Sequence, residues 1–177
     1  MLPYTPLHHL LLSRGFTALV MTSANLSEEP ICIANGEALS RLAGIADAFL
    51  VHDRDILQRC DDSVVRAVAG RPRMLRRSRG YVPAPVFLQS PLPPVLACGA
   101  GLKNTFCLAE GRNAFLSQHI GDLENPEALS FFEEAVALLQ KILEIEPEIV
   151  AHDLHPDYLS TGYALARPDG KKAAVQH

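Results

Sequence analysis

Apolar residues recur at steps of three and four over residues 125–147, the longest regular pattern in this chain. The spacing places them along one face, which is typical of an amphipathic helix packed on a core. Asn125 is a suitable N-cap, Pro126 suits the first turn, and Pro147 lies just past the expected end. The predicted apolar face consists of Leu129, Phe132, Val136, Leu139, Ile142 and Leu143.

Shorter apolar runs surround this predicted helix. Residues 95–122 are interpreted as strand, glycine turn, strand, tight turn around Gly111 and strand, which predicts an antiparallel meander. Residues 148–156 predict a strand that ends in a polar loop, and residues 157–167 predict a further helix. The apolar run at 174–177 begins another strand, for which the sequence suggests no partner.

The first half of the chain alternates short helical and strand patterns, bounded by turn-forming residues. The predicted elements are a helix over 5–14 with a Thr5 cap and a stop at Gly15, a buried strand over 17–23, a helix over 35–46 capped by Asn35, a strand over 47–54, and two strands within 61–80 around a turn at Gly70–Pro72.

A proline-rich segment divides the 177 residues into two parts. Residues 82–95 contain five of the 13 prolines, which favour an extended and stiff backbone. We therefore place a linker at 89–93, between units at 1–88 and 94–177. Each unit has few elements for a closed core, so we expect the back of one domain followed by the front of another.

Composition narrows the function classes. The formal net charge of −4 and the absence of Trp disfavour nucleic acid as a partner. The four cysteines include no CxxC pair, so we expect buried, reduced thiols instead of a zinc knuckle. No apolar run reaches the length of about 20 residues that a spanning helix needs, so no membrane partner is expected and the expected location is the cytoplasm.

Small polar residues gather in "VMTSANLSEEP", directly after the predicted strand over 17–23. Ser23, Asn25 and Ser27 supply hydroxyl and amide groups there. Small side chains at a strand tip leave backbone N–H groups open to a phosphate or a ribose. Capping of a following helix explains the same residues equally well.

A basic segment follows further along the chain. Strand alternation places Arg76 on the face opposite to its neighbours Arg71, Arg73, Arg77 and Arg79. Clustered guanidinium groups suit a triphosphate, although a solvated sheet edge also favours such charges. The preceding carboxylates, Asp61 and Asp62, are expected to pair with these arginines, with magnesium binding as the alternative.

Three polar stretches in the second half are weaker candidates. "GAGLKN" brings glycines and Lys103 to a turn, without P-loop spacing, so a phosphate site and an ordinary hairpin turn both fit. "SQHIGD" forms a polar tip with His119 and Asp122, and "HDLHPDY" supplies His152, Asp153, His155 and Asp157. Metal ligation, acid–base chemistry and helix capping are all open for the last stretch.

Taken in order, these stretches resemble one family along nearly the whole chain. The matching blocks are "MLPYTPLHHLLL", "VMTSANLSEEP", "CDDSVVR", "LRRSRGYVP", "LKNTFCLA", "FLSQHIGDLEN" and "HDLHPDYLST". They are similar to the HypF family of hydrogenase-maturation carbamoyltransferases. The resemblance implies an α/β (α+β) fold: residues 1–88 would be the C-terminal part of a twisted-sheet, YrdC-like ATP-binding domain, and 94–177 the first part of an actin-like ATPase domain.

The resemblance also implies site residues. Those implied in nucleotide binding are Ser23, Asn25, Ser27, Ser63, Arg79, Lys103 and Asn104. Asp122, Asp153 and His155 are further candidates, and no catalytic residue is assigned. His177 matches the first histidine of the family's "QHHHAH" motif, which implies that it is a ligand of a divalent metal, zinc or iron.

The chemistry implied by the resemblance begins with ATP, Mg²⁺ and carbamoyl phosphate. Carbamate derived from carbamoyl phosphate would attack ATP to form carbamoyl adenylate. The carbamoyl group would then pass to the C-terminal cysteine of the partner protein HypE, as the precursor of a cyanide ligand. Two alternatives stay open: a threonylcarbamoyl-adenylate synthase acting in tRNA modification, and an inactive nucleotide-binding or partner-docking module.

Overall fold

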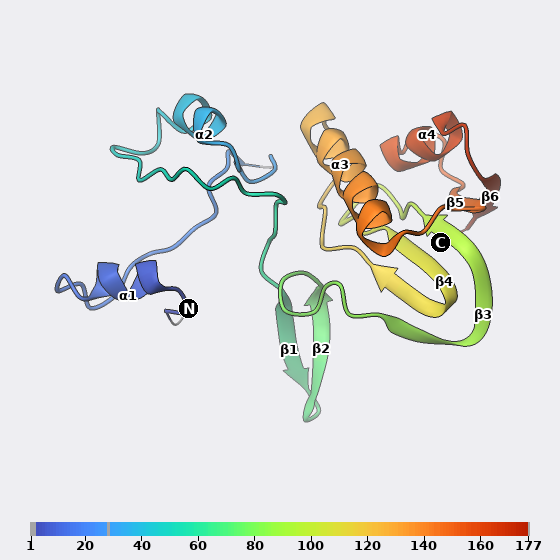
Figure 1. Ribbon diagram of the computed structural model, residues 1–177, viewed down its shortest axis with the longest axis horizontal. Helices are drawn as coiled ribbons and strands as arrows, with labels where there is room; N and C mark the ends of the chain where they lie inside the picture. Colours follow the sequence, from blue (N-terminus) through green and yellow to red (C-terminus); the bar gives the residue numbers. More distant parts are fainter. Residues whose placement is uncertain (1–2, 28, 177) are drawn as a thin grey trace.

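Long loops dominate residues 3–60 of the computed structural model, whereas residues 86–175 form a layered α/β unit (Figure 1). The structure describes residues 3–27 and 29–176. We call residues 3–85 of this description the first unit and residues 86–176 the second unit. Every helix in the described ranges is too short or too polar to cross a lipid bilayer.

The second unit is built on a four-stranded sheet with the order β4-β3-β5-β6. β3 and β4 pair antiparallel, whereas β5 runs parallel to β3 and to β6. Helices connect the parallel strands, as the crossover of a parallel pair requires. The bounds are β3 Val86–Ala97, β4 Cys107–Leu116, α3 Pro126–Leu143, β5 Ile149–Asp153, α4 Leu159–Ala166 and β6 Lys171–Val175.

The core of the second unit lies between α3 and this sheet. Phe132 of α3 is fully buried, and its ring meets those of Phe106 and Tyr163 edge to face at centroid distances of 5.6 and 5.1 Å. The Asn125 side chain caps α3 by accepting a hydrogen bond of 2.7 Å from the Ala128 amide. The predicted helix and its cap are confirmed, although Ile142 is exposed.

Two strand predictions for the second unit are wrong. Gly111 lies inside β4 with a φ of +56°, where the pairing with β3 shifts register, so it forms an irregularity in one strand and not a turn between two. In place of the predicted three-stranded meander, β3 and β4 form an antiparallel hairpin, and β5 pairs parallel with β3. The last strand does have a partner, because β6 pairs with β5 from Lys171 to Val175.

Most of the proline-rich segment lies within β3, which begins at Val86. It is extended, as predicted, but it pairs with β4 at Val86, Phe87 and Leu92. The register is irregular between these pairs, which fits prolines that cannot donate to a ladder. A linker at 89–93 and the division into domains there stay predictions.

Two short helices belong to the first unit. α1 spans Pro6–Leu12, and the Thr5 hydroxyl caps it by accepting from the His8 amide at 3.2 Å, as predicted. α2 spans Asn35–Arg41. Asn35 is not its cap, because the cap position is Ala34. The side-chain amide of Asn35 instead donates to the His52 carbonyl at 2.6 Å.

The strands predicted at 17–23 and 47–54 are loops in the structure. Val20 is 100% exposed and Leu50 is 78% exposed, so neither run is buried. A strand is stable only when a neighbour completes its ladder and a layer covers its apolar face. Neither condition is met among the described residues.

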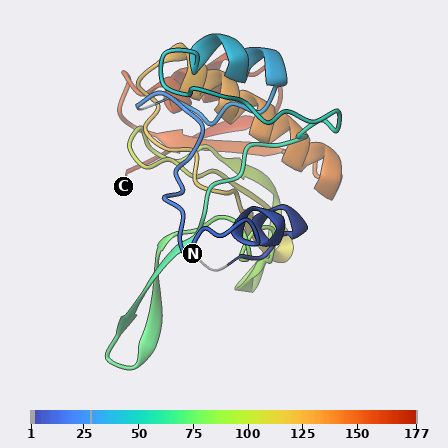
Figure 2. The same cartoon turned by 90° about the vertical axis from the view of Figure 1, so that its left-hand side faces the viewer.

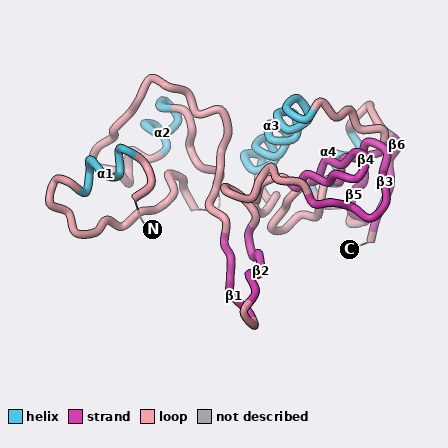
Figure 3. The backbone as a smooth tube through the Cα atoms, turned by 60° about the horizontal axis from the view of Figure 1, so that its bottom comes forward, coloured by secondary structure: helices cyan, strands magenta, loops and turns pink. Residues whose placement is uncertain are grey.

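A two-stranded hairpin projects from the first unit (Figures 1 and 3). β1 spans Val64–Val68 and pairs antiparallel with β2, Arg71–Arg76. The turn is formed by Ala69 and Gly70, which both have positive φ, at +50° and +71°. The hairpin is confirmed, but its turn precedes the one predicted at Gly70–Pro72.

The four cysteines are all free thiols. Cys32 and Cys98 are buried, and burial raises the pKa of Cys98 to about 12. Cys107 is half-buried, whereas Cys60 is exposed, contrary to the expectation of buried thiols.

Candidate functional site

The two units enclose a hollow between the loop that carries Ser23 and Asn25 and the loop that carries His119 and Asp122. It has two adjoining parts of about 120 and 480 Å³, which share Asn25 and His119. The larger part falls within the size range of small-molecule sites. We call the two parts together the junction cavity. The polar and charged residues that line it include Ser23, Asn25, Glu29, Asp61, Arg76, His119, Asp122 and Glu124.

The Ser23–Asn25 loop is held by its own hydrogen bonds. The Asn25 side-chain amide donates to the carbonyls of Leu26 and Glu29 at 2.8 and 3.0 Å. The Cys32 amide closes the loop by donating to the Ala24 carbonyl at 2.8 Å. Asn25 Oδ1 is buried and accepts no hydrogen bond from the described residues. The loop therefore offers an unused acceptor at the cavity.

Charges of both signs line the cavity. Asp61 and Arg76 form an ion pair of 2.6 Å. Burial lowers the pKa of His119 below its ordinary value of 6.5, and the positive charge of Arg76 lowers it further. Asp122 accepts a hydrogen bond of 2.5 Å from the Lys103 backbone amide. The cavity therefore combines charged side chains with an imidazole whose neutral form is favoured.

Contacts between the units bring these groups together. The His119 amide donates to the Arg77 carbonyl at 2.9 Å, and the neighbouring Gln118 side chain donates to the Arg59 carbonyl. Arg59 also pairs with Glu134 of α3 at 2.8 Å. In Figure 2 the first unit is seen in front of the second, with α2 ahead of α3.

Ser63 and Arg79 form a separate cluster. The Ser63 hydroxyl donates to the Arg79 carbonyl at 2.9 Å and accepts from the Ser78 amide at 2.8 Å. The Arg79 guanidinium binds Asp62 and lies 5.1 Å from the ring centroid of Tyr4. Neither residue lines the junction cavity. The predicted pairing of both aspartates with arginines is confirmed, which leaves Asp61 and Asp62 engaged and poorly suited to hold magnesium by themselves.

Neither Lys103 nor Asn104 lines the junction cavity. Lys103 lines a neighbouring cavity of about 720 Å³, together with Arg76, Arg77 and His119. Asn104 is buried, and its side-chain amide donates to the carbonyls of Cys98 and Ala100 at 2.9 and 2.6 Å. These bonds give Asn104 a structural role, and nucleotide contact by either residue stays a prediction.

The remaining candidates lie elsewhere. Ser27 is exposed and does not line the cavity. Asp153 accepts from the His155 amide at 2.8 Å, and the His155 ring stacks on Tyr158 at 4.3 Å, so both stabilise the turn before α4. Across residues 3–27 and 29–176 no three His, Cys, Asp or Glu side chains gather as metal ligands. The predicted ligand His177 lies outside the described residues.

Of the described residues that the family resemblance implies, the structure brings Ser23, Asn25 and Asp122 to the cavity and leaves the others outside it. Arg59 was not among the candidates from the sequence, because an arginine between Gln58 and Cys60 resembles an ordinary surface position. Two other lining residues, Arg76 and His119, were noted only as members of a basic run and of a polar tip. Nothing in their local spacing connects them.

Two family models cover most of the chain. The model Sua5_yciO_yrdC, described as "Telomere recombination", matches residues 1–78, and the model HypF_C, described as "HypF Kae1-like domain", matches residues 90–177. The junction cavity is lined by residues from both matched ranges.

Named relatives match across both units. The protein named carbamoyltransferase HypF2 of Cupriavidus necator is 52% identical over an alignment of 198 residues. The alignment covers 100% of this chain and 24% of the relative. That named carbamoyltransferase HypF of Synechocystis sp. is 51% identical over 165 residues, 93% of this chain and 22% of the relative. The chain belongs to the HypF family. It spans about a quarter of the length of these relatives.

Two solved structures share the fold. The crystal structure described as full-length HypF in the phosphate- and nucleotide-bound form aligns with 100% of this chain and 28% of its own, with a TM-score of 0.92 and 48% identity. The crystal structure of T. kodakarensis HypF aligns with 89% of this chain and 21% of its own, with a TM-score of 0.82 and 40% identity. The mixed α/β fold class is thereby confirmed.

Proposed function

We propose that this segment supplies part of the nucleotide site of an ATP-dependent carbamoyltransferase that acts in [NiFe]-hydrogenase maturation. The names of the relatives support the carbamoyltransferase activity, and the phosphate- and nucleotide-bound form of a 48% identical relative supports the ligand class. The observation that carries the proposal is the junction cavity, which joins the Ser23–Asn25 loop to the His119–Asp122 loop.

The cavity groups suit different parts of such ligands. Phosphate oxygens only accept hydrogen bonds, so they would be met by backbone amides, the Ser23 hydroxyl and Arg76. Asn25 Oδ1 needs a donor instead, and a ribose hydroxyl, the adenine amino group or the amino group of carbamate would supply one. Mg²⁺ carried by ATP would reduce the repulsion between its phosphates and Asp61 or Asp122.

The proposed reaction has two steps. A carbamate oxygen attacks the α-phosphorus of ATP, pyrophosphate leaves, and carbamoyl adenylate forms. The thiolate of the C-terminal cysteine of HypE then attacks the carbamoyl carbon, and AMP leaves. A divalent metal in the complete second domain, with His177 as one ligand, and a cytoplasmic location belong to this proposal as well.

Labelled pyrophosphate exchange into ATP, measured on a full-length protein that carries this segment, tests the reaction. Exchange that depends on carbamoyl phosphate is the expected result. Exchange that instead requires threonine and bicarbonate would overturn the proposal in favour of tRNA modification. Absence of exchange with either substrate set would also overturn it and leave a binding or docking module.

ATP binding by variants of the loop tests the site itself. Ser23→Ala removes a hydroxyl that makes no hydrogen bond with the described residues, so the loop should keep its shape. Loss of one hydrogen bond to ATP in Ser23→Ala or Asn25→Ala should raise the Kd for ATP about fivefold to tenfold. Asn113→Ala, at an exposed position of β4, is the matched control. Unchanged Kd values in both loop variants would remove this site assignment.

A further inference from the structure

Arg59 contacts more parts of the junction than any of its neighbours in the loop before β1. Its Nε donates to the Ile31 carbonyl at 2.9 Å, beside the cavity. Its two terminal nitrogens reach Glu134 at 2.8 Å and Glu37 at 3.7 Å. The guanidinium carbon lies 5.6 Å from the ring centroid of Phe131. One side chain therefore joins the first unit to α3 of the second.

The backbone of Arg59 makes a further contact across the junction. Its carbonyl accepts a hydrogen bond from the side chain of Gln118, which is buried. Gln118 directly precedes His119, whose amide donates to the Arg77 carbonyl at 2.9 Å. The cavity loop of the second unit is thus attached to the first unit through two successive residues, Gln118 and His119.

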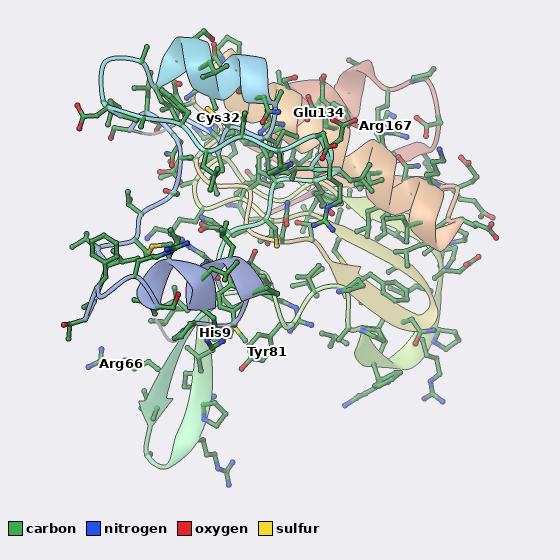
Figure 4. All side chains as sticks on the ribbon, turned by 60° about the vertical axis from the view of Figure 1, so that its left-hand side comes forward. His9, Cys32, Arg66, Tyr81, Glu134 and Arg167 are labelled. Carbon is green, nitrogen blue, oxygen red and sulfur yellow. The ribbon has the colours of Figure 1, made fainter. Side chains whose placement is uncertain are left out.

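The surroundings of Arg59 favour a fixed geometry. Its side chain is 15% exposed, compared with 58% for Glu134, so the ion pair is partly shielded from solvent. A planar guanidinium donates from several nitrogens at fixed angles and can stack flat on an aromatic ring, whereas an ammonium group is a compact point charge without this planar shape. Figure 4 labels Glu134 on α3 and Cys32 on the loop before α2, the two structural elements that Arg59 joins.

We infer that Arg59 is a positioning residue that holds the Ser23–Asn25 loop in register with the His119–Asp122 loop. On the proposed function, this role serves the nucleotide site, because Arg59 joins the elements that carry the two halves of the cavity. Removal of the side chain should therefore separate the two loops while each unit keeps its fold.

Amide hydrogen exchange can detect this separation at single residues. The His119 amide is bonded across the junction to Arg77, whereas the next amide, Ile120, is bonded within the second unit to the Asn104 carbonyl at 2.9 Å. Local opening of the junction exposes the first amide and leaves the second protected. Global destabilisation would accelerate the exchange of both, so the pair distinguishes positioning from general stability.

The variants are made in the full-length protein. In Arg59→Ala we expect His119 to exchange at least tenfold faster, with less than threefold change at Ile120. Arg59→Lys should fall between Arg59→Ala and the wild type, because lysine keeps the charge near Glu134 but cannot also reach Ile31. Equal acceleration at both amides, or no acceleration at His119, overturns the inference.

Arg167→Ala is the matched control. Arg167 is 17% exposed, pairs with Asp169 at 2.6 Å and lies 5.5 Å from the Tyr163 ring, so it resembles Arg59 in burial and contacts. All these partners belong to the second unit. Its loss should not accelerate His119 more than Ile120. If Arg59→Ala does not fold, Glu134→Gln decides: preferential acceleration at His119 by about threefold supports the inference, and no preference overturns it.

Kinetics give a second, separable readout. On the proposed function, Arg59→Ala should raise the KM for ATP in pyrophosphate exchange at least fivefold, because the two loops that it separates form the nucleotide site, whereas Arg167→Ala should change this KM less than twofold. An unchanged KM in Arg59→Ala, or equal effects of the two variants, would overturn a positioning role at this site. A wild type without any exchange would contradict the proposed function, and the amide measurements would still decide whether Arg59 positions the junction.

Discussion

Substitution of Asn104 by alanine should destabilise the second unit by about 2–3 kcal/mol. The side chain is 2% exposed and donates to the carbonyls of Cys98 and Ala100. A net contribution of about 0.5–1.5 kcal/mol for each hydrogen bond, together with the cost of leaving buried carbonyls without this donor, gives that magnitude. The same bonds shape the glycine turn between β3 and β4, so the turn should loosen.

Urea denaturation, followed by the loss of helical circular dichroism from α3, measures this effect. With an m-value of about 1–2 kcal/mol/M, the midpoint should fall by roughly 1–3 M. The control is Asn113→Ala, which removes the same group from an exposed position in β4 and should change stability by less than about 0.5 kcal/mol.

The opposite pattern would refute this reasoning. If Asn104→Ala unfolds at the wild-type midpoint but binds ATP more weakly, the residue contacts the nucleotide, as the family resemblance implies, and its hydrogen bonds contribute little to the fold. If stability falls while the Kd for ATP is unchanged, the structural role alone explains the effect of the substitution.

Two further predictions concern the core and the cavity. Phe132→Ala should lower the free energy of unfolding by about 3–5 kcal/mol, because it empties a fully buried aromatic site that contacts Phe106 and Tyr163; urea denaturation of the second unit measures it. Burial lowers the pKa of His119 from 6.5, so the fold favours the neutral form of its side chain. Its contribution to stability should therefore be complete above pH 6.5 and should decrease as the pH falls toward the pKa of His119 in the folded state. In His119→Gln this part of the pH dependence should vanish from unfolding midpoints measured between pH 5 and 8.

The second unit could largely be predicted from local patterns. α3 carries its own cap, its own apolar face and a left-handed end at Glu144, so a short window of sequence specifies it. Gly111 misled the prediction because a glycine at positive φ serves a turn and an irregular strand equally well. The distinction depends on β3, whose register no local pattern reveals.

The site could be predicted only in part. The polar tips with Asn25 and Asp122 follow from composition, since small polar groups beside apolar runs are conspicuous. The contacts that bring the tips together join residues far apart in sequence: Arg59 lies 59 positions from Gln118 and 75 from Glu134. Ion pairs of this kind leave no periodic signal, so Arg59 could be found only from the fold.

The Ser23–Asn25 loop reaches the cavity without the strand that the apolar pattern predicts before it. Residues 17–23 are a loop, and Val20 is fully exposed. The loop is held instead by its internal Asn25 bonds and by the Ile31 carbonyl bound to Arg59. In the described chain, then, the second unit contributes to the placement of the loop through Glu134 and Phe131. Because the support comes from across the junction, the geometry of the candidate site depends on how firmly the two units are joined.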